Sequence, residues 1–231
     1  MKKHIFISAT RHKKEETTIY KCHQRSISFN AFPLEVIENN ICGLSQLYNT
    51  ILQKYKNEYD YIHFVHDDVW IYDDTGLLIQ EIEQSNYDIS GVAGAGRCKI
   101  SYPSGWYDMA VKADPYQLRG HIEHKLMDKQ TSLELQFSKN NFNDRCVIVD
   151  GVYMCVKTTN LQNWKFNENY KFHHYDLASC IDAIHQNLKV GVVNLHLRHE
   201  LRPRPAITAD PIWIESDKKF REEYVKYTNN K

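Results

Sequence analysis

Short apolar runs alternate with amphipathic stretches over the first 93 residues, and this alternation constrains the fold more than any other feature. Four runs have the length and composition of buried strands: residues 4–8, 34–38, 61–65 and 89–93. Between them, the stretches 15–29, 46–56 and 76–84 space their apolar residues as amphipathic helices do. Strands that alternate with helices build a parallel sheet covered on both faces. The alternation therefore predicts an α/β layer of the kind that forms the nucleotide-binding half of many enzymes.

The second half of the chain is less regular. Residues 94–143 hold scattered glycines and aromatic side chains without a clear period. Strand patterns return at 146–156, interrupted at Asp150 and Gly151, and at 190–197, while helical patterns return at 177–187 and 217–227. No repeat, low-complexity segment or linker divides the 231 residues, so a single domain is expected.

The charge balance and the cysteines limit the class of protein. The 29 basic side chains equal the 29 acidic ones, so no basic field favours nucleic acid as a partner. The six cysteines form no CxxC pair, which argues against a zinc finger or a disulfide framework and favours reduced thiols. No apolar run is long enough for a signal peptide or a membrane span. We expect a cytoplasmic protein, with peripheral contact to the inner face of the membrane left open.

Two adjacent carboxylates follow the third apolar run. Asp67 and Asp68 stand in the sequence FVHDDV, directly after the predicted strand 61–65. Burying ionised carboxylates is costly unless something compensates the charge, and ligands bind at the carboxyl ends of strands in such sheets. Hard oxygen donors suit Mg²⁺ or Mn²⁺, which often bridge a protein to substrate phosphates. The alternative is a solvated turn of the kind that Asp73 and Asp74 indicate.

A third carboxylate, Asp176, stands where a helix is expected to begin, in the run FNENYKFHHYDLASC. A carboxylate held near a cleft can act as a general base that accepts a proton from a hydroxyl. The alternative is an N-cap, whose side-chain oxygen satisfies unpaired helix amides. The preceding His173 and His174 are interpreted as surface residues on a loop.

Polar groups are expected to gather at one edge of the sheet, because several predicted strands end in them. These groups lie at 8–11, 38–40, 66–68 and 150–151. His199 ends the last predicted strand and can complete a metal site with Asp68, or it is a surface histidine. Arg202 and Arg204 follow it, and their guanidinium groups suit a diphosphate, unless they form a charge-balanced surface turn.

Three other motifs favour simpler interpretations. His121, Glu123 and His124 lack the HExxH spacing of zinc proteases and are interpreted as part of a surface helix. The glycine-rich GVAGAG run at 91–96 lacks the Lys-Ser/Thr of a phosphate loop. Four aromatic residues can stack on a sugar or pack in the core; they are Tyr102, Trp106, Tyr107 and Tyr116.

Five segments together resemble the glycosyltransferase family 2-like proteins with a GT-A fold. In chain order they are NNICGLSQLYN (39–49), FVHDDV (64–69), VDGVYMCVK (149–157), FNENYKFHHYDLASCIDA (166–183) and VGVVNLHLRHE (190–200). The resemblance covers roughly residues 3–200. It implies a GT-A-like (Rossmann-like), mostly parallel central sheet flanked by helices in a single α/β domain. Within it, a nucleotide-binding half spans about 1–93, an acceptor-binding and catalytic half about 94–205, and a C-terminal helix about 206–231.

The same resemblance implies an activity and a set of site residues. A sugar would move from a nucleotide-sugar donor to the hydroxyl of a glycan, lipid-linked or other acceptor, with inversion and with Asp176 as general base. Asp68 and His199 would hold Mn²⁺ or Mg²⁺, and Trp106, Asp150 and Gly151 would lie near the acceptor. The residues expected near the donor are Ser8, Thr10, Arg11, Glu38, Asn40, Asp67, Arg202 and Arg204.

The chain departs from the family pattern at two points. It has HDD in place of a plain DxD, which leaves open whether Asp67 meets the metal or the ribose, and Tyr175 precedes Asp176 where a glutamate is common. Two other functions stay open. A nucleotidyltransferase is expected to carry a glycine-rich basic loop after the first strand, but ATRHKK contains no glycine. A non-catalytic carbohydrate-binding protein would not need Asp68, Asp176 and His199 together.

Overall fold

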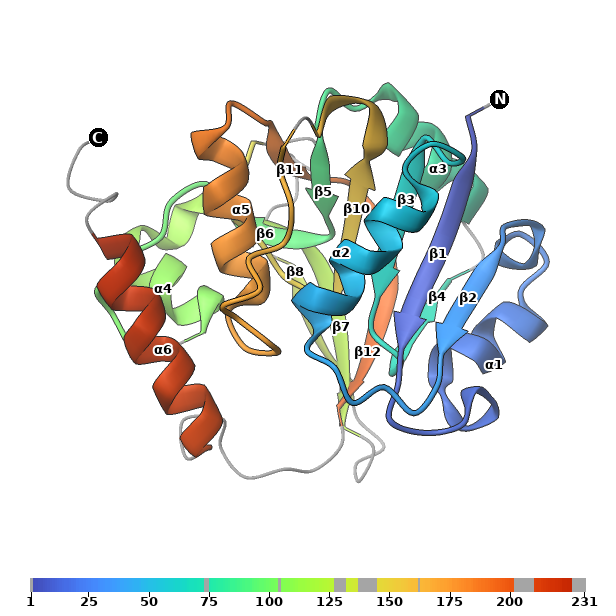
Figure 1. The fold of residues 1–231 in the computed structure, drawn as a ribbon, viewed down its shortest axis with the longest axis horizontal. Coiled ribbons are helices and arrows are strands. Elements are labelled where there is room, and N and C mark those ends of the chain that lie inside the picture. Colours follow the sequence, from blue (N-terminus) through green and yellow to red (C-terminus); the bar gives the residue numbers. More distant parts are fainter. Residues whose placement is uncertain are drawn as a thin grey trace.

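The computed structural model describes residues 2–72, 75–103, 105–126, 132–136, 145–161, 163–201 and 210–225. These residues form two six-stranded sheets and six α-helices (Figure 1). The mixed α/β class agrees with the alternation in the sequence, but the single central sheet that was predicted is in fact two sheets. None of the described helices is both long enough and apolar enough to cross a membrane.

The first sheet is mostly parallel and has the strand order β11-β5-β10-β3-β1-β2. Its strands are β1 (His4–Ala9), β2 (Leu34–Ile37), β3 (Tyr61–Val65), β5 (Ile89–Gly91), β10 (Tyr153–Lys157) and β11 (Val190–Val192). β10 runs antiparallel to both of its neighbours, whereas the other pairs are parallel. The sheet is therefore not purely parallel.

The second sheet has the order β4-β12-β7-β6-β9, with β8 added beside β7. Its strands are β4 (Val69–Ile71), β6 (Ala93–Ala95), β7 (Leu118–Leu126), β8 (Ser132–Gln136), β9 (Ile148–Val149) and β12 (Leu197–Leu201). Among its pairs only β12 and β7 run parallel.

Three predicted strands divide between the two sheets. The run 89–93 is β5 and β6, which separate at Val92, and the run 146–156 is β9 and β10. In the run 190–197, only the first residues, Val190–Val192, form β11, and β12 begins at Leu197. Most residues of each run are apolar and buried on both sides of the break, so composition alone did not mark the change of sheet.

The surface helix predicted around His121 to His124 is wrong, because these residues lie in β7. The strand has neighbours on both sides, so its histidines lie within the sheet although their polar character resembles a surface pattern. His121 is buried, and His124 is half-buried.

Helices cover both faces of the first sheet. The six α-helices of the described chain are α1 (Thr18–Arg25), α2 (Leu44–Tyr55), α3 (Thr75–Gln84), α4 (Trp106–Ala113), α5 (Tyr175–His185) and α6 (Pro211–Tyr224), of which α4 packs against β6 and β7 of the second sheet. Short 3₁₀ turns occupy Lys14–Glu16, Phe29–Ala31, Pro115–Gln117 and Thr158–Asn160. The helix predicted over 15–29 is shorter because Thr17 caps α1, where its side chain accepts a hydrogen bond from the amide of Tyr20.

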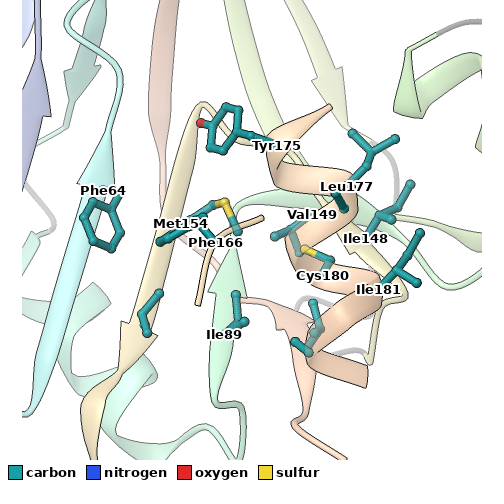
Figure 2. Close-up of a cluster of buried hydrophobic side chains, with 14 of the residues drawn as sticks. Phe64, Ile89, Ile148, Val149, Met154, Phe166, Tyr175, Leu177, Cys180 and Ile181 are labelled. Atoms are coloured by element: carbon teal, nitrogen blue, oxygen red, sulfur yellow. The ribbon is translucent and has the colours of Figure 1, made fainter. Parts of the chain in front are cut away.

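The strand period divides the core into two clusters. Ile5 and Ile7 of β1 face one cluster, whereas the intervening Phe6 faces the other. The first cluster packs α2 and α5 on the sheet; Figure 2 shows Met154 of the sheet between Phe64 of β3 and Cys180 of α5. The second cluster holds α1 and α3 on the opposite face. Both faces are therefore covered by apolar packing, and the polar side chains within the strands, such as His4 and His63, are themselves buried.

Candidate functional site

Strand ends from both halves of the chain meet at one edge of the first sheet, as the sequence predicted. β1, β2 and β3 run parallel, so the residues after Ala9, Ile37 and Val65 emerge together. β10 runs the other way, with Tyr153 opposite Val65. This reversal brings the preceding Asp150 and Gly151 to the same edge.

A cleft of about 590 Å³ opens there. Its walls come from the ends of β1 and β3, from β7 and β12 of the second sheet, and from the first turns of α5 and α6. The residues that matter for chemistry are His66, Asp67, Asp68, Trp106, His124, Asp150, Gly151, His174, Tyr175, Asp176, His199 and Trp213. The candidate base, acceptor and metal residues thus share one cavity.

His66, Asp68 and His199 form a cluster of potential metal ligands. One donor atom from each lies within 4.8 Å of the others. Nε2 of His199 is 3.1 Å from Oδ1 of Asp68, a buried oxygen that makes no well-aligned hydrogen bond within the described chain. Burial acts to raise the pKa of Asp68, but His199 and His66 outweigh it and hold that pKa below its usual range. Two imidazoles and a carboxylate, one oxygen of which is buried and unsatisfied, fit a divalent cation.

Tyr175 fixes the orientation of His66. The phenol donates a 2.9 Å hydrogen bond to the carbonyl oxygen of Gly151. Since that uses its only proton, it accepts the 3.3 Å hydrogen bond from Nε2 of His66. Burial lowers the pKa of His66, which favours the neutral ring. Its Nδ1 then carries the lone pair that a metal requires, which is how partners of ligand histidines set the tautomer.

Asp176 is buried in the first turn of α5. Its Oδ2 accepts a 2.8 Å hydrogen bond from the amide of Gly151, and its Oδ1 accepts a 3.0 Å bond from the amide of Leu177. Burial, reinforced by the charge of Asp150, raises the pKa of Asp176 to about 7. The N-cap of α5 is His174 rather than Asp176, so the N-cap interpretation placed the helix start wrongly.

The acceptor candidates form one connected group beside Asp176. Nε1 of Trp106 donates a 2.6 Å hydrogen bond to Oδ2 of Asp150, whose other oxygen accepts from the amide of Val152. Trp106, Asp150 and Gly151 all line the cleft. The tryptophan therefore fixes the carboxylate that lies next to the candidate base.

The donor candidates are less closely gathered. Asp67 lines the cleft, and its carbonyl oxygen accepts from the amides of Thr18 and Ile19. Arg11 and Asn40 line a neighbouring pocket of about 460 Å³. Ser8 and Thr10 are buried, and Glu38 accepts a hydrogen bond from the amide of Lys14. Arg202 and Arg204 lie outside the described residues.

Sequence reasoning missed several residues of this cleft. The surface interpretation of His174 is wrong: it is 5% exposed, its Nδ1 lies 3.1 Å from Oγ of Ser216, and its Nε2 lies 3.6 Å from Oδ1 of Asp217. These contacts hold α6 against the start of α5, and Trp213 of α6 lines the cleft. The sequence could have predicted His66 as a metal ligand, since it directly precedes the carboxylate pair. The contributions of α6 and β7 depend on tertiary packing and carry no local signal.

Comparisons with known proteins identify no family. No protein-family profile and no curated protein sequence matches the chain. Among solved structures, A197 from STIV is 9% identical with a TM-score of 0.48, over 86% of each chain. S. aureus TarS 1–349 in complex with UDP-GlcNAc is 12% identical with a TM-score of 0.49, over 97% of this chain and 72% of that one. The inositol-1-phosphate CTP transferase from T. maritima is 11% identical with a TM-score of 0.40, over 96% and 97%. The chain spans 44% of the longer TarS chain. Likenesses at these scores assign neither family nor activity.

Proposed function

We propose that this protein is a metal-dependent glycosyltransferase that moves a sugar from a nucleotide-sugar donor to an acceptor hydroxyl with inversion. The observation that carries the proposal is that one cleft holds both a buried carboxylate of pKa about 7 and a His–Asp–His cluster. A carboxylate with a pKa near 7 is matched to general-base work at neutral pH. A cation cluster in the same cavity suits a substrate whose leaving group is a diphosphate.

Asp176 takes the proton of the attacking hydroxyl. The amides of Gly151 and Leu177 each bind one of its oxygens and hold the carboxylate in place. The second lone pair of each oxygen stays available for the acceptor. Trp106 orients Asp150, whose negative charge helps to keep the pKa of Asp176 high and so strengthens it as a base. A single base that acts directly on the acceptor fits a one-step inverting displacement.

Asp68, His199 and His66 are the residues that would hold Mn²⁺ or Mg²⁺. When bound, the ion would supply positive charge that offsets the charge of the leaving diphosphate. Asp67 lines the cleft beside this cluster, and Arg11 and Asn40 line a pocket after β1 and β2, toward which the nucleoside would extend. The acceptor would be a glycan, a lipid-linked group or another hydroxyl compound.

The test is to incubate the full chain with a panel of nucleotide-sugars and Mn²⁺ and to quantify released nucleoside diphosphate. Calorimetry with a nucleoside diphosphate, with and without Mn²⁺, then compares the parent with Asp68→Ala. The metal-dependent part of the affinity is expected to disappear in the variant, while its melting temperature in metal-free buffer stays close to that of the parent. Unchanged metal-dependent affinity would remove Asp68 from the metal site.

The released product separates this function from its rivals. A nucleotidyltransferase consumes a nucleoside triphosphate and releases pyrophosphate, whereas a glycosyltransferase releases nucleoside diphosphate. A carbohydrate-binding protein binds saturably and releases neither. The absence of glycine from residues 10–14, after β1, favours the glycosyltransferase.

A further inference from the structure

We propose that His124 supplies an additional imidazole to the His66–Asp68–His199 cluster, and that this histidine-rich set selects a transition-metal dication over Mg²⁺. The inference rests on the metal-dependent function proposed above and specifies its ion. His124 does not belong to the sequence segments that resemble glycosyltransferases. Its strand was not apparent from the sequence.

The position of His124 follows from the second sheet. β7 and β12 run parallel, and His124 of β7 is the direct register partner of His199 of β12. Register partners on adjacent strands point to the same face. The two rings accordingly lie 5.4 Å apart between centroids, and both residues line the cleft. His199 in turn lies 5.8 Å from the ring of His66. Three imidazoles therefore meet in one part of the cleft, each from a different strand or strand end.

One nitrogen of the His124 ring has no hydrogen-bond partner among the described residues. This atom, Nδ1, is buried. Buried polar atoms in native proteins nearly always have a partner, and an exception requires an explanation such as an ion. His124 stands outside the 4.8 Å cluster, so a rotation of the side chain toward His199 is the movement that would bring it to a shared ion.

The chemistry of the donor set decides which ion fits. Mg²⁺ strongly prefers oxygen ligands in octahedral geometry and usually keeps several waters. Imidazole nitrogen suits transition metals, whose affinities for nitrogen donors rise along the first row. Three imidazoles and a single carboxylate therefore form a poor magnesium site and a good site for Fe²⁺, Co²⁺ or Zn²⁺, with Mn²⁺, the weakest binder of the first-row series, expected between them.

The experiment measures binding of Co²⁺, Mn²⁺ and Mg²⁺ to the full chain without nucleotide, by calorimetry, with visible absorption of the Co²⁺ form as a second readout. The parent is expected to bind Co²⁺ at least about tenfold more tightly than Mg²⁺. His124→Ala is expected to lose about 10–100-fold in Co²⁺ affinity and to change the absorption spectrum. His124→Gln, which keeps a polar side chain of similar length, guards against loss of folding.

His121→Ala is the matched control. His121 lies on the same strand but on the opposite face of the sheet, where its ring contacts His196. This variant is expected to bind Co²⁺ like the parent.

Two results would overturn this inference alone: equal affinities of the parent for Mg²⁺ and Co²⁺, or parental Co²⁺ affinity and spectrum in both His124 variants. Failure of the parent to bind any of the three ions would overturn it together with the metal in the proposed function. Transfer of sugar by metal-free protein would identify that second case.

Discussion

The backbone amide of Gly151 donates a 2.8 Å hydrogen bond to Oδ2 of Asp176. This bond joins the segment that leads into β10 to the first turn of α5, two parts of the chain 25 residues apart. A side chain at Gly151 has no room, because an added Cβ would lie 2.4 Å from the phenol oxygen of Tyr175 and 3.0 Å from Cβ of Asp176. The glycine thus permits the close approach that holds the candidate base.

Gly151→Ala is expected to displace Tyr175 and Asp176 together. We expect a loss of about 1–3 kcal/mol in the free energy of unfolding, as for overpacked sites, and a lower transfer rate. Gly105→Ala is the matched control, since Gly105 lines the same cleft, has φ −67° and leaves open space for a Cβ. Chemical denaturation and a rate assay on both variants check the prediction. Identical behaviour of the two variants would contradict it.

Asp176→Asn is expected to lower turnover by about 10²–10⁴-fold while donor affinity stays near that of the parent. The amide oxygen can still accept a backbone hydrogen bond, but the side chain no longer accepts a proton. Asp182→Asn, in the same helix but outside the cleft, controls for effects on α5. Single-turnover kinetics and donor binding separate the two steps. Parental turnover in Asp176→Asn would leave this residue with a structural role only.

Stability is expected to fall as the pH rises toward neutrality, because of Asp176. Its pKa is raised in the folded protein from 3.8 to about 7, chiefly by burial. The folded form therefore keeps a proton that the unfolded chain has lost, so this contribution to stability is full below pH 3.8 and is gone once the pH passes about 7. The slope is at most about 1.4 kcal/mol per pH unit. Urea unfolding of the parent and of Asp176→Asn across this range checks it; parallel curves would show that Asp176 does not titrate there.

Tyr175→Phe is expected to weaken metal binding by about 10–100-fold, the usual cost of losing a partner of a ligand histidine. The phenol supports Nε2 of His66 and the carbonyl of Gly151 at once. Tyr170→Phe, which loses a phenol hydrogen bond to Glu223 away from the cleft, is the control. Calorimetry with Mn²⁺ measures the difference between the two variants. Equal affinities would mean that the orientation of His66 does not depend on Tyr175.

Local patterns predicted much of the fold because they depend on neighbouring residues. Short apolar runs identified β1 and β3, which are buried along almost their whole length, and β3 was predicted with its observed bounds, Tyr61–Val65. The place of Asp68 at the shared edge followed from the parallel strands, whereas Asp150 reaches that edge because β10 runs antiparallel, which the sequence did not show. The assignment of strands to sheets was not anticipated, since Val92 looks like its apolar neighbours although the chain changes sheet there. For the same reason His124, which depends on pairing between β7 and β12, was taken for a surface residue.

The connection between β3 and β4 runs from the first sheet to the second. The His–Asp–His cluster takes ligands from both sides of this connection. His66 directly follows β3 of the first sheet. Asp68 directly precedes β4, and His199 lies in β12, and both of these strands belong to the second sheet. An ion bound by all three would act as a cross-link between the sheets, in addition to any part it takes in chemistry. Its concentration would then set the apparent melting temperature, with a gain of about 2.7 kcal/mol at an ion concentration of 100 Kd. Removal of the ion by a chelator would weaken the contact between the two sheets first. Faster amide hydrogen exchange in β3 and β12 would report this local opening.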